Sequence, residues 1–408
     1  MIEESFDTFI SREGTSSVKW DLRQEVFGKR DVLPLWIADM DVRCPQPIIE
    51  AFKKRVDHGI FGYTGKTASF YDAIIGWEKR RHGWPVKREW ISCCPGIVSG
   101  INTAIQAFSQ PGDKVIIQPP VYHPFYDAVI GNGRQLVFNP LKKESGRFTI
   151  DFEDLEKKID DRTKILILCS PHNPVGRVWT ADELEKLAKI CIRKDVIVLS
   201  DEIHQDIVYA PHRHIPIASL TTDAQGSPLP IGERTITFIA PSKTFNIAGL
   251  ASSAVIIPNK RLFVEFEHRL NANGLGMGNV FGILGLEVAY NEGEEWLSRL
   301  LPYLEENIDF TLKALEESIP QIKSQKPDGT FLLWFDCEAL GKDDLCLRNW
   351  FIEKASLGLD SGVVFGPGGE QHMRFNIGCP RRTLVEALDR LKTALAEEKP
   401  ASGFHFTH

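Results

Sequence analysis

The stretch T-F-I-A-P-S-K-T-F-N-I-A-G-L, residues Thr237–Leu250, decides the expected fold of this chain. It begins inside an apolar run that favours a β-strand, Thr235–Ala240, and the run stops at a proline. Lys243 follows at once, at the carboxyl end of that strand. Partial burial lowers the pKa of an amine and makes it nucleophilic, as a lysine that forms a Schiff base requires. The alternative is a lysine that extends its ammonium group to water.

The overall composition is that of a globular protein with an excess of acidic residues. The chain has 408 residues, of which 43% are hydrophobic, and a formal net charge of -7. This length suffices for one large domain and a smaller one. The charge offers no basic field that would attract nucleic acid or anionic lipid. No apolar run reaches transmembrane length and the first residues are acidic, so we expect a cytoplasmic protein without a membrane partner.

The cysteines and histidines do not form a recognisable metal or disulfide pattern. None of the eight cysteines belongs to a C-x-x-C pair, and several lie in apolar runs. They are therefore expected to be buried free thiols in a reducing compartment. His204, His212 and His214 cluster in sequence, but their spacing fits no common site and we expect no metal.

Strand-like and helix-like segments alternate over the first two thirds of the chain. Expected strands, after a short one that ends at Pro95-Gly96, are Lys114–Gln118, Gln135–Phe138, Lys164–Cys169, Val196–Leu199, Thr235–Ala240 and Ser253–Ile257. Expected helices are Pro47–Gly59, Ser69–His82, Tyr122–Gly131, Asp151–Lys158 and Thr180–Lys194, the last two with capping residues Asp151 and Thr180. This alternation predicts an α/β fold with a mostly parallel sheet between helices.

The pattern changes from about Leu286. Long helical runs cover Glu294–Ile319, Leu345–Ala355 and Thr383–Glu398, and short strands are expected at Thr330–Asp336, Val363–Phe365 and Met373–Asn376. These elements predict a second, smaller α+β unit. We assign no role to the C-terminal tail, S-G-F-H-F-T-H.

Polar residues follow three of the expected strands. Asn173 lies in S-P-H-N-P-V-G-R, Asp201 in S-D-E-I-H and Lys243 in P-S-K. Ligands of an open parallel sheet bind at the carboxyl ends of its strands. We therefore expect these three side chains to converge at one edge of the sheet.

Two further features favour anions. A helix is expected to begin directly after Gly96, where free backbone N–H groups and the helix dipole attract a phosphate. Arg374 lies on a strand among apolar residues in M-R-F-N-I-G-C-P-R, where it requires an anionic partner. The alternative for Gly96 is an ordinary strand-to-helix turn, and the alternative for Arg374 is an internal salt bridge.

Taken in order, these motifs resemble the fold-type-I enzymes that depend on pyridoxal 5′-phosphate (PLP), within the aminotransferase class I/II superfamily. The chain is most similar to the MalY/PatB type of cystathionine β-lyase, from about Ile37 to Arg381. The matching motifs are A-D-M-D (Ala38–Asp41), G-Y-T (Gly62–Thr64), S-P-H-N-P-V-G-R-V-W (Ser170–Trp179), D-E-I-H (Asp201–His204), K-T-F-N-I-A-G-L (Lys243–Leu250) and R-F-N-I-G-C-P (Arg374–Pro380).

The resemblance implies a role for each matching residue. Lys243 would bind PLP covalently and then act as general base and acid. Asp201 would pair with the pyridine nitrogen and keep it protonated. Arg374 would bind the substrate α-carboxylate as a two-pronged donor, in a site that also includes Ala38 and Asn173. The other cofactor contacts implied are Asn173 on the ring oxygen, Tyr122 on the ring face, His204, and Gly96, Ile97, Val98 and Ser242 on the phosphate.

The resemblance also implies quaternary structure and domain limits. Tyr63 matches a residue that reaches the phosphate of the neighbouring subunit, so a homodimer with shared active sites is implied, and Tyr63 and Tyr122 join Lys243 as catalytic residues. The fold implied is a large domain with a mostly parallel seven-stranded sheet, residues 46–287, and a small α+β domain, residues 288–408. Residues 1–45 would form an arm and part of the small domain.

The implied reaction is a β-elimination that cleaves L-cystathionine or a related cysteine S-conjugate to a thiol, pyruvate and ammonia. Many aminotransferases carry an arginine eight residues after the lysine and a tyrosine three residues after the aspartate, where this chain has Ala251 and His204. Both differences favour a lyase. An aminotransferase of aromatic or aliphatic amino acids shares the early steps and remains the alternative, and an added regulatory role in binding another protein also remains open.

Overall fold

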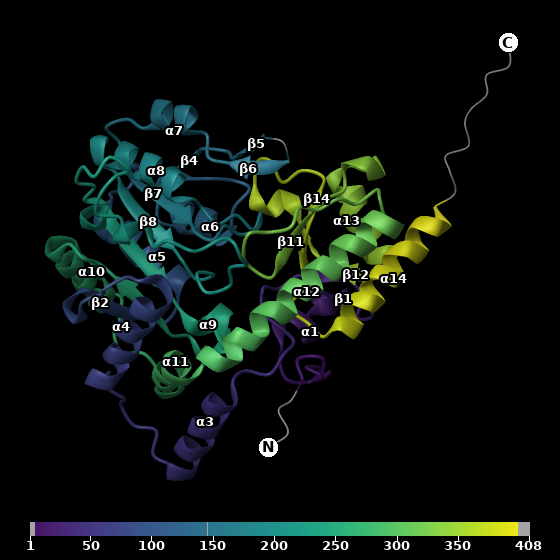
Figure 1. Cartoon of the computed structure of the whole chain (residues 1–408), viewed down its shortest axis with the longest axis horizontal. Coiled ribbons are helices and arrows are strands. Elements are labelled where there is room, and N and C mark those ends of the chain that lie inside the picture. Colours follow the sequence, from purple (N-terminus) through teal and green to yellow (C-terminus); the bar gives the residue numbers. More distant parts are fainter. Residues whose placement is uncertain (1–4, 145, 399–408) are drawn as a thin grey trace.

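The computed structural model describes residues 5–144 and 146–398, and the C-terminal tail lies outside these residues. Seven strands form the central sheet in the order β2-β10-β9-β8-β7-β3-β4 (Figure 1). They are β2 (Ile91–Cys94), β3 (Lys114–Ile117), β4 (Gln135–Phe138), β7 (Thr163–Cys169), β8 (Ile197–Asp201), β9 (Thr235–Ile239) and β10 (Ser253–Ile256). Only β10 runs antiparallel to its neighbours, so the mostly parallel seven-stranded sheet is confirmed.

Helices cover both faces of this sheet, which is why its strands read as continuous apolar runs. Along β7, Ile165 and Ile167 pack into one apolar cluster, and the alternating residues Leu166 and Leu168 pack into another. The first cluster lies under α5 (Ile97–Phe108), α6 (Pro124–Gly131) and α10 (Lys260–Ala272), and the second under α7 (Phe152–Lys158) and α8 (Ala181–Arg193). Two further helices, α3 (Gln46–His58) and α4 (Ala68–His82), both pack against α11 (Val280–Glu292).

The helix starts follow the signals in the sequence. Thr180 accepts a hydrogen bond from the N–H of Glu183, whose carboxylate accepts one from the N–H of Thr180, so the capping box is present. Asp151 caps α7 through the N–H of Asp154. Helix α6 begins at Pro124 instead of Tyr122, because proline is favoured in the first helical turn, where no N–H is needed.

A smaller unit contains an antiparallel sheet in the order β11-β14-β13, made of β11 (Leu332–Asp336), β14 (His372–Asn376) and β13 (Asp360–Ser361). Its helices are α12 (Glu294–Ser318), α13 (Asp344–Glu353) and α14 (Arg381–Glu397). The N-terminal segment joins it, because β1 (Leu33–Pro34) pairs in parallel with β12 (Leu357–Gly358). Shorter elements are β5 (Lys142–Glu144), β6 (Arg147–Thr149), α1 (Val18–Asp21), α2 (Arg23–Phe27), α9 (Pro241–Thr244) and 3-10 turns at Arg88–Trp90, Ile217–Ser219, Ile231–Arg234, Ala248–Leu250 and Glu338–Leu340.

The strand expected at Val363–Phe365 is wrong. These residues form a 3-10 helix, Gly362–Phe365, whose two valines are 43% and 46% exposed. Gly362 approaches Gly369 so closely that a Cβ would lie 2.0 Å from the Gly369 carbonyl oxygen. The turn imposed by this contact outweighs the strand preference of two β-branched residues.

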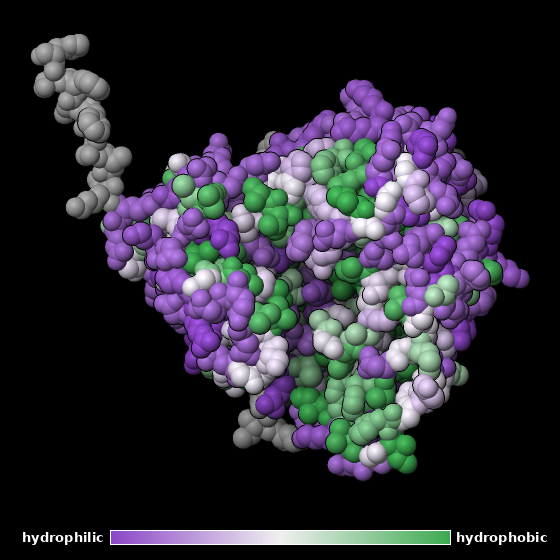
Figure 2. Space-filling view, turned by 180° about the vertical axis from the view of Figure 1, so that it is seen from behind, coloured by the Kyte–Doolittle hydropathy of each residue, from purple (hydrophilic) through white to green (hydrophobic). Residues whose placement is uncertain are grey.

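The surface is mainly hydrophilic in Figure 2, with apolar side chains gathered near one end, where α3 lies.

All eight cysteines are free, and six are buried. Cys44 is half-buried and Cys346 is exposed, which corrects the expectation that these two are buried. None of the described helices is both long and apolar enough to span a membrane.

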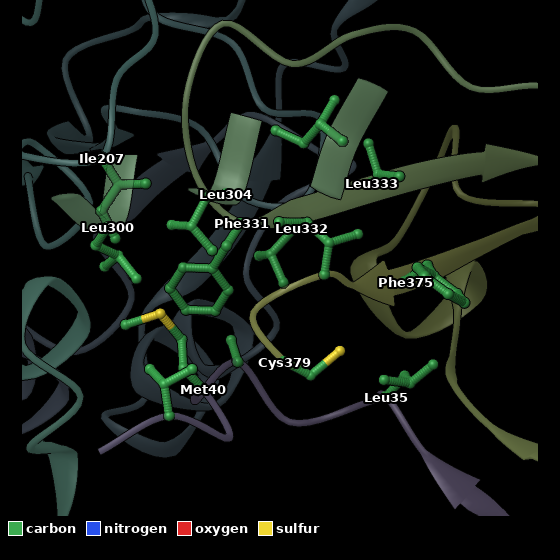
Figure 3. Packing of buried hydrophobic residues seen from close by; sticks show 14 of the residues in the cluster. Leu35, Met40, Ile207, Leu300, Leu304, Phe331, Leu332, Leu333, Phe375 and Cys379 are labelled. Carbon is green, nitrogen blue, oxygen red and sulfur yellow. The ribbon is translucent and has the colours of Figure 1, made fainter. Parts of the chain in front are cut away.

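One apolar cluster connects the N-terminal segment, the seven-stranded unit and the smaller unit. Figure 3 shows Leu35 and Met40 of the N-terminal segment close to Phe331, Leu332, Phe375 and Cys379 of the smaller unit, with Ile207, Leu300 and Leu304 alongside. Leu304 of α12 is fully buried in this cluster. The packing therefore holds together the three segments that carry Ala38, Asp201 and Arg374.

Leu304→Ala is expected to lower the free energy of unfolding by about 2–5 kcal/mol, because it leaves a cavity in this cluster. Leu345→Ala is the control, since Leu345 is 68% exposed and its truncation removes little packing. Chemical denaturation of both variants measures the difference, and equal stabilities would contradict the packing described.

Candidate active site

Lys243 lies in a single helical turn directly after β9. Proline at position 241 begins this turn, α9, immediately beyond the last buried residues of the strand. The Lys243 amine donates a hydrogen bond to the Ala38 carbonyl oxygen at 2.5 Å, so it bonds the N-terminal segment instead of extending into water. Burial lowers the pKa of Lys243 to about 8; Asp39 and Asp201 raise it, and Arg374 lowers it further. The lowered pKa gives Lys243 a larger neutral, nucleophilic fraction near neutral pH than an ordinary lysine has.

Asp201 is the last residue of β8, the neighbour of β9. Its side chain is buried and accepts one hydrogen bond within the described chain, from the Ile203 N–H at 3.2 Å. Burial raises the pKa of this carboxyl group to about 7, although the Ile203 N–H and the charge of Lys243 act to lower it. A buried carboxyl group with so few donors fits a ligand that brings a cationic N–H.

Asn173 contacts both Arg374 and Tyr122. The Arg374 Nη1 donates to Asn173 Oδ1 at 3.1 Å, and the Tyr122 N–H donates to the Asn173 carbonyl at 3.1 Å. Burial raises the pKa of Tyr122 to about 12; the charge of Asp201 adds to this rise and that of Arg374 opposes it. The expected convergence of Asn173, Asp201 and Lys243 is therefore observed, with Arg374 among them.

Arg374 lies on β14 and is almost fully buried. Its Nη2 donates to the Trp36 carbonyl at 2.7 Å and to the carboxylate of Asp360, and its guanidinium lies over the Phe365 ring, 4.9 Å from the ring centre. The internal salt bridge considered from the sequence is thus present. Asp360 was missed because it belongs to no motif; only the pairing of β13 with β14 places it opposite Arg374.

The start of α5 has the properties of an anion site. Gly96 is the N-cap residue, without a side-chain cap, and a Cβ there would meet no atom within 4 Å. Ile97 is buried and Val98 is partly exposed. Since Cys94 pairs with Ser253, this helix start lies next to the segment that follows Lys243. The helix end therefore offers free N–H groups beside the site.

Three other predicted site residues differ in how deeply they are buried. Ser242 is half-buried in α9 beside Lys243. His204 is buried near Phe331, and its Nδ1 has no hydrogen-bond partner within the described residues. Tyr63 is 96% exposed, so this chain alone does not bring it to the site.

His212 and His214 pair with Asp328 and Glu202, and no cluster of potential metal ligands occurs among the described residues.

A buried polar network around Asp206 contacts the turn that carries Lys243, through Thr244, and the sequence did not predict it. Asp206 accepts hydrogen bonds from Thr244 at 2.8 Å and Trp77 at 3.1 Å and is paired with His82 at 3.0 Å. Burial acts to raise the pKa of Asp206, but His82 lowers it overall, so the carboxylate stays charged. Because Thr244 is the neighbour of Lys243, this network fixes the turn that carries the lysine. The sequence signal was the last residue of D-E-I-H-Q-D, the second aspartate of this stretch.

The comparisons with known proteins agree with this geometry. The chain matches the family described as aminotransferase class I and II over residues 30–391. It belongs to this family. It is 46% identical to the cystathionine β-lyase PatB of Bacillus subtilis, over 96% of this chain and 100% of PatB.

Two solved structures extend the comparison to three dimensions. A PLP-bound aminotransferase-like protein of Clostridium difficile is 42% identical with a TM-score of 0.92, and covers 96% of this chain and 99% of its own. The PLP-bound C–S lyase of Staphylococcus hominis is 31% identical with a TM-score of 0.89, over 97% and 99%. The fold of this chain is accordingly the fold-type-I architecture.

In the protein without cofactor, Lys243 is expected to titrate with a pKa of about 8. Asp39→Asn should lower this value, because it removes a negative charge that raises the pKa of Lys243. The pH dependence of lysine acetylation, followed peptide by peptide with mass spectrometry, measures both effects, and the exposed lysines serve as an internal reference. Titration of Lys243 at the ordinary value of 10.5 would contradict the environment described.

Proposed function

We propose that this protein is a PLP-dependent carbon–sulfur β-lyase that cleaves L-cystathionine or a related cysteine S-conjugate to a thiol, pyruvate and ammonia. The observation that carries the proposal is the convergence of Lys243, Asp201 and Arg374 at one edge of the sheet. The 46% identity with a cystathionine β-lyase over nearly the whole chain supports the choice of reaction. Arg374 favours a substrate with an α-carboxylate.

The described residues fit PLP in three ways. Asp201 is a buried carboxyl group with a raised pKa and no cationic hydrogen-bond donor among the described residues, which suits a partner of the pyridine nitrogen. The start of α5 at Gly96 offers N–H groups to a phosphate, which Ser242 supplements. Asn173 supplies a side-chain amide for the ring oxygen, Tyr122 a half-buried ring beside it, and His204 an unpaired ring nitrogen.

Each residue then has a defined task in the reaction. When bound, PLP supplies an electron sink that stabilises negative charge at the substrate Cα. Arg374 binds the α-carboxylate and Asn173 helps to orient it. Lys243 removes the proton from Cα, because its lowered pKa of about 8 increases the neutral fraction of the amine that can act as a base. The thiolate leaves from Cβ, and the remaining three-carbon fragment hydrolyses to pyruvate and ammonia.

We further propose a cytoplasmic homodimer with active sites at the subunit interface. Tyr63 would reach the partner's cofactor phosphate, which accounts for a tyrosine that is 96% exposed in the single chain. Exposed apolar residues lie close to Tyr63 in sequence, at and beyond the end of α3: Val56, Ile60 and Phe61. Apolar side chains gather at that end of the molecule (Figure 2).

We also propose the domain limits 1–45, 46–287 and 288–408, with a small domain built from both ends of the chain. The pairing of β1 with β12 supports this arrangement.

Incubation with L-cystathionine alone is expected to release pyruvate in step with homocysteine. An aminotransferase would instead need an oxo-acid such as 2-oxoglutarate and would yield glutamate. This is the competing activity to exclude, because the similar Clostridium difficile protein is described as an aminotransferase. Lactate dehydrogenase and thiol assays, with and without 2-oxoglutarate, distinguish the two. Glutamate formation without pyruvate would overturn the proposed reaction.

The purified protein is expected to be yellow, and Lys243→Ala should lose the absorbance of covalently bound PLP and essentially all activity. Asp328→Asn is a control for a buried charge elsewhere, because Asp328 pairs with Arg147 and Arg177 outside the proposed site. This control should keep the absorbance. A colourless wild-type protein after reconstitution with PLP would refute the cofactor assignment.

A further inference from the structure

Arg374, the proposed anchor of the substrate α-carboxylate, already has most of its donors engaged by the protein. Nη2 donates to the Trp36 carbonyl and to Asp360, and Nη1 donates to Asn173. Nε is buried and has no partner within the described residues. The guanidinium therefore holds a carboxylate of its own chain before any substrate binds.

The stereochemistry of the guanidinium makes Asp360 a competitor of the substrate. A carboxylate binds arginine most strongly through two parallel N–H groups. The planar group offers two such edges, Nε with Nη2 and Nη1 with Nη2, and Nη2 belongs to both. Both hydrogens of Nη2 are engaged, by Trp36 and by Asp360. A two-pronged substrate carboxylate must therefore displace one of these two acceptors.

Asp360 is the acceptor whose displacement has an electrostatic consequence. It lies on β13 directly opposite Arg374, and its side chain is 18% exposed. The titratable groups that face it are Arg374, His123 at the start of α6 and Tyr122. Burial raises the pKa of Asp360, whereas the charges of Arg374 and His123 lower it. Burial also lowers the pKa of His123, so near neutral pH this histidine adds little positive charge.

Two carboxylates on one buried guanidinium repel each other, and one of them is then favoured in the neutral form. We propose that the substrate α-carboxylate replaces Asp360 on Arg374, and that Asp360 takes up a proton from solvent when this occurs. The hydrogen bond from Nη2 to Asp360 breaks, one from Nη2 to the substrate forms, and the proton neutralises the released acid. This inference rests on the proposed function in that Arg374 is taken as the substrate anchor.

The proton uptake by Asp360 determines how the affinity for a carboxylate changes with pH. At low pH Asp360 is neutral and competes weakly, so carboxylates bind well. As the pH rises above the pKa of Asp360, binding must bring in one proton, and affinity falls by up to about tenfold per pH unit. Asp360 is therefore a specificity-determining residue that adjusts KM and leaves kcat largely unchanged.

Propionate binding to the PLP-loaded protein tests the coupling without any turnover. Calorimetry in buffers of different ionisation enthalpy counts the protons taken up at several pH values. The wild type should take up about one proton at alkaline pH, as the linkage requires. Asp360→Asn and Asp360→Ser should abolish this uptake and bind propionate more tightly at alkaline pH. Asp336→Asn is the matched control, because Asp336 is a carboxylate of the adjacent strand β11 that pairs with Lys143.

Activity gives a second, separate readout. With the same amino-acid substrate, KM of wild type relative to Asp360→Asn should rise with pH, while the two kcat values stay similar. Absence of proton uptake by the wild type would overturn the proposal, as would weaker propionate binding in both Asp360 variants, since that result means Asp360 only orients Arg374. Loss of uptake in His123→Gln with retention in Asp360→Asn would assign the proton to His123 and also overturn it. A protein that takes up the proton but forms no pyruvate would refute the lyase and leave the role of Asp360 standing.

Discussion

The site depends on the register of three neighbouring parallel strands. Cys169 of β7 lies opposite Asp201 of β8, and Asp201 lies opposite Phe238 of β9. The chain leaves the sheet at the same edge three times, and polar residues follow the apolar strand each time. Because parallel strands present their carboxyl ends together, Asn173, Asp201 and Lys243 share one rim although 70 residues of sequence, including two further strands and a helix, separate the first from the last.

Electrostatic balance at this rim comes from segments outside the sheet. The N-terminal segment supplies the Ala38 carbonyl to Lys243 and the Trp36 carbonyl to Arg374. Its Asp39, which raises the pKa of Lys243, is itself held by Arg12 at 2.7 Å. The N-terminal segment therefore helps to position Lys243 and offsets part of the lowering of its pKa by burial, and the apolar cluster of Figure 3 keeps this segment in place.

The positive charge of buried Arg374 is compensated by a neighbouring acid. A buried guanidinium without an acid would be costly, and Asp360 provides the compensating charge. The same contact occupies donors that the proposed substrate carboxylate would use. The internal ion pair and the proposed binding of a carboxylate thus compete for one nitrogen atom, Nη2, and the proposed proton uptake by Asp360 depends on this competition.

The sequence by itself determined the alternation of strands and helices, the helix caps and the residues at the strand ends, because these depend on local pattern and on the general geometry of parallel sheets. It also predicted Lys243, Asp201, Asn173 and Arg374 as site residues, through motifs whose order matches a known family. It failed at Val363–Phe365, where a contact between two glycines outweighs strand preference. Only the tertiary structure decided that Asp360 faces Arg374, that Asp206 supports Thr244, and that Ala38 accepts the Lys243 hydrogen bond. These pairs lie 14, 38 and 205 residues apart in sequence, and no local pattern specifies which distant backbone or carboxylate a buried cation meets.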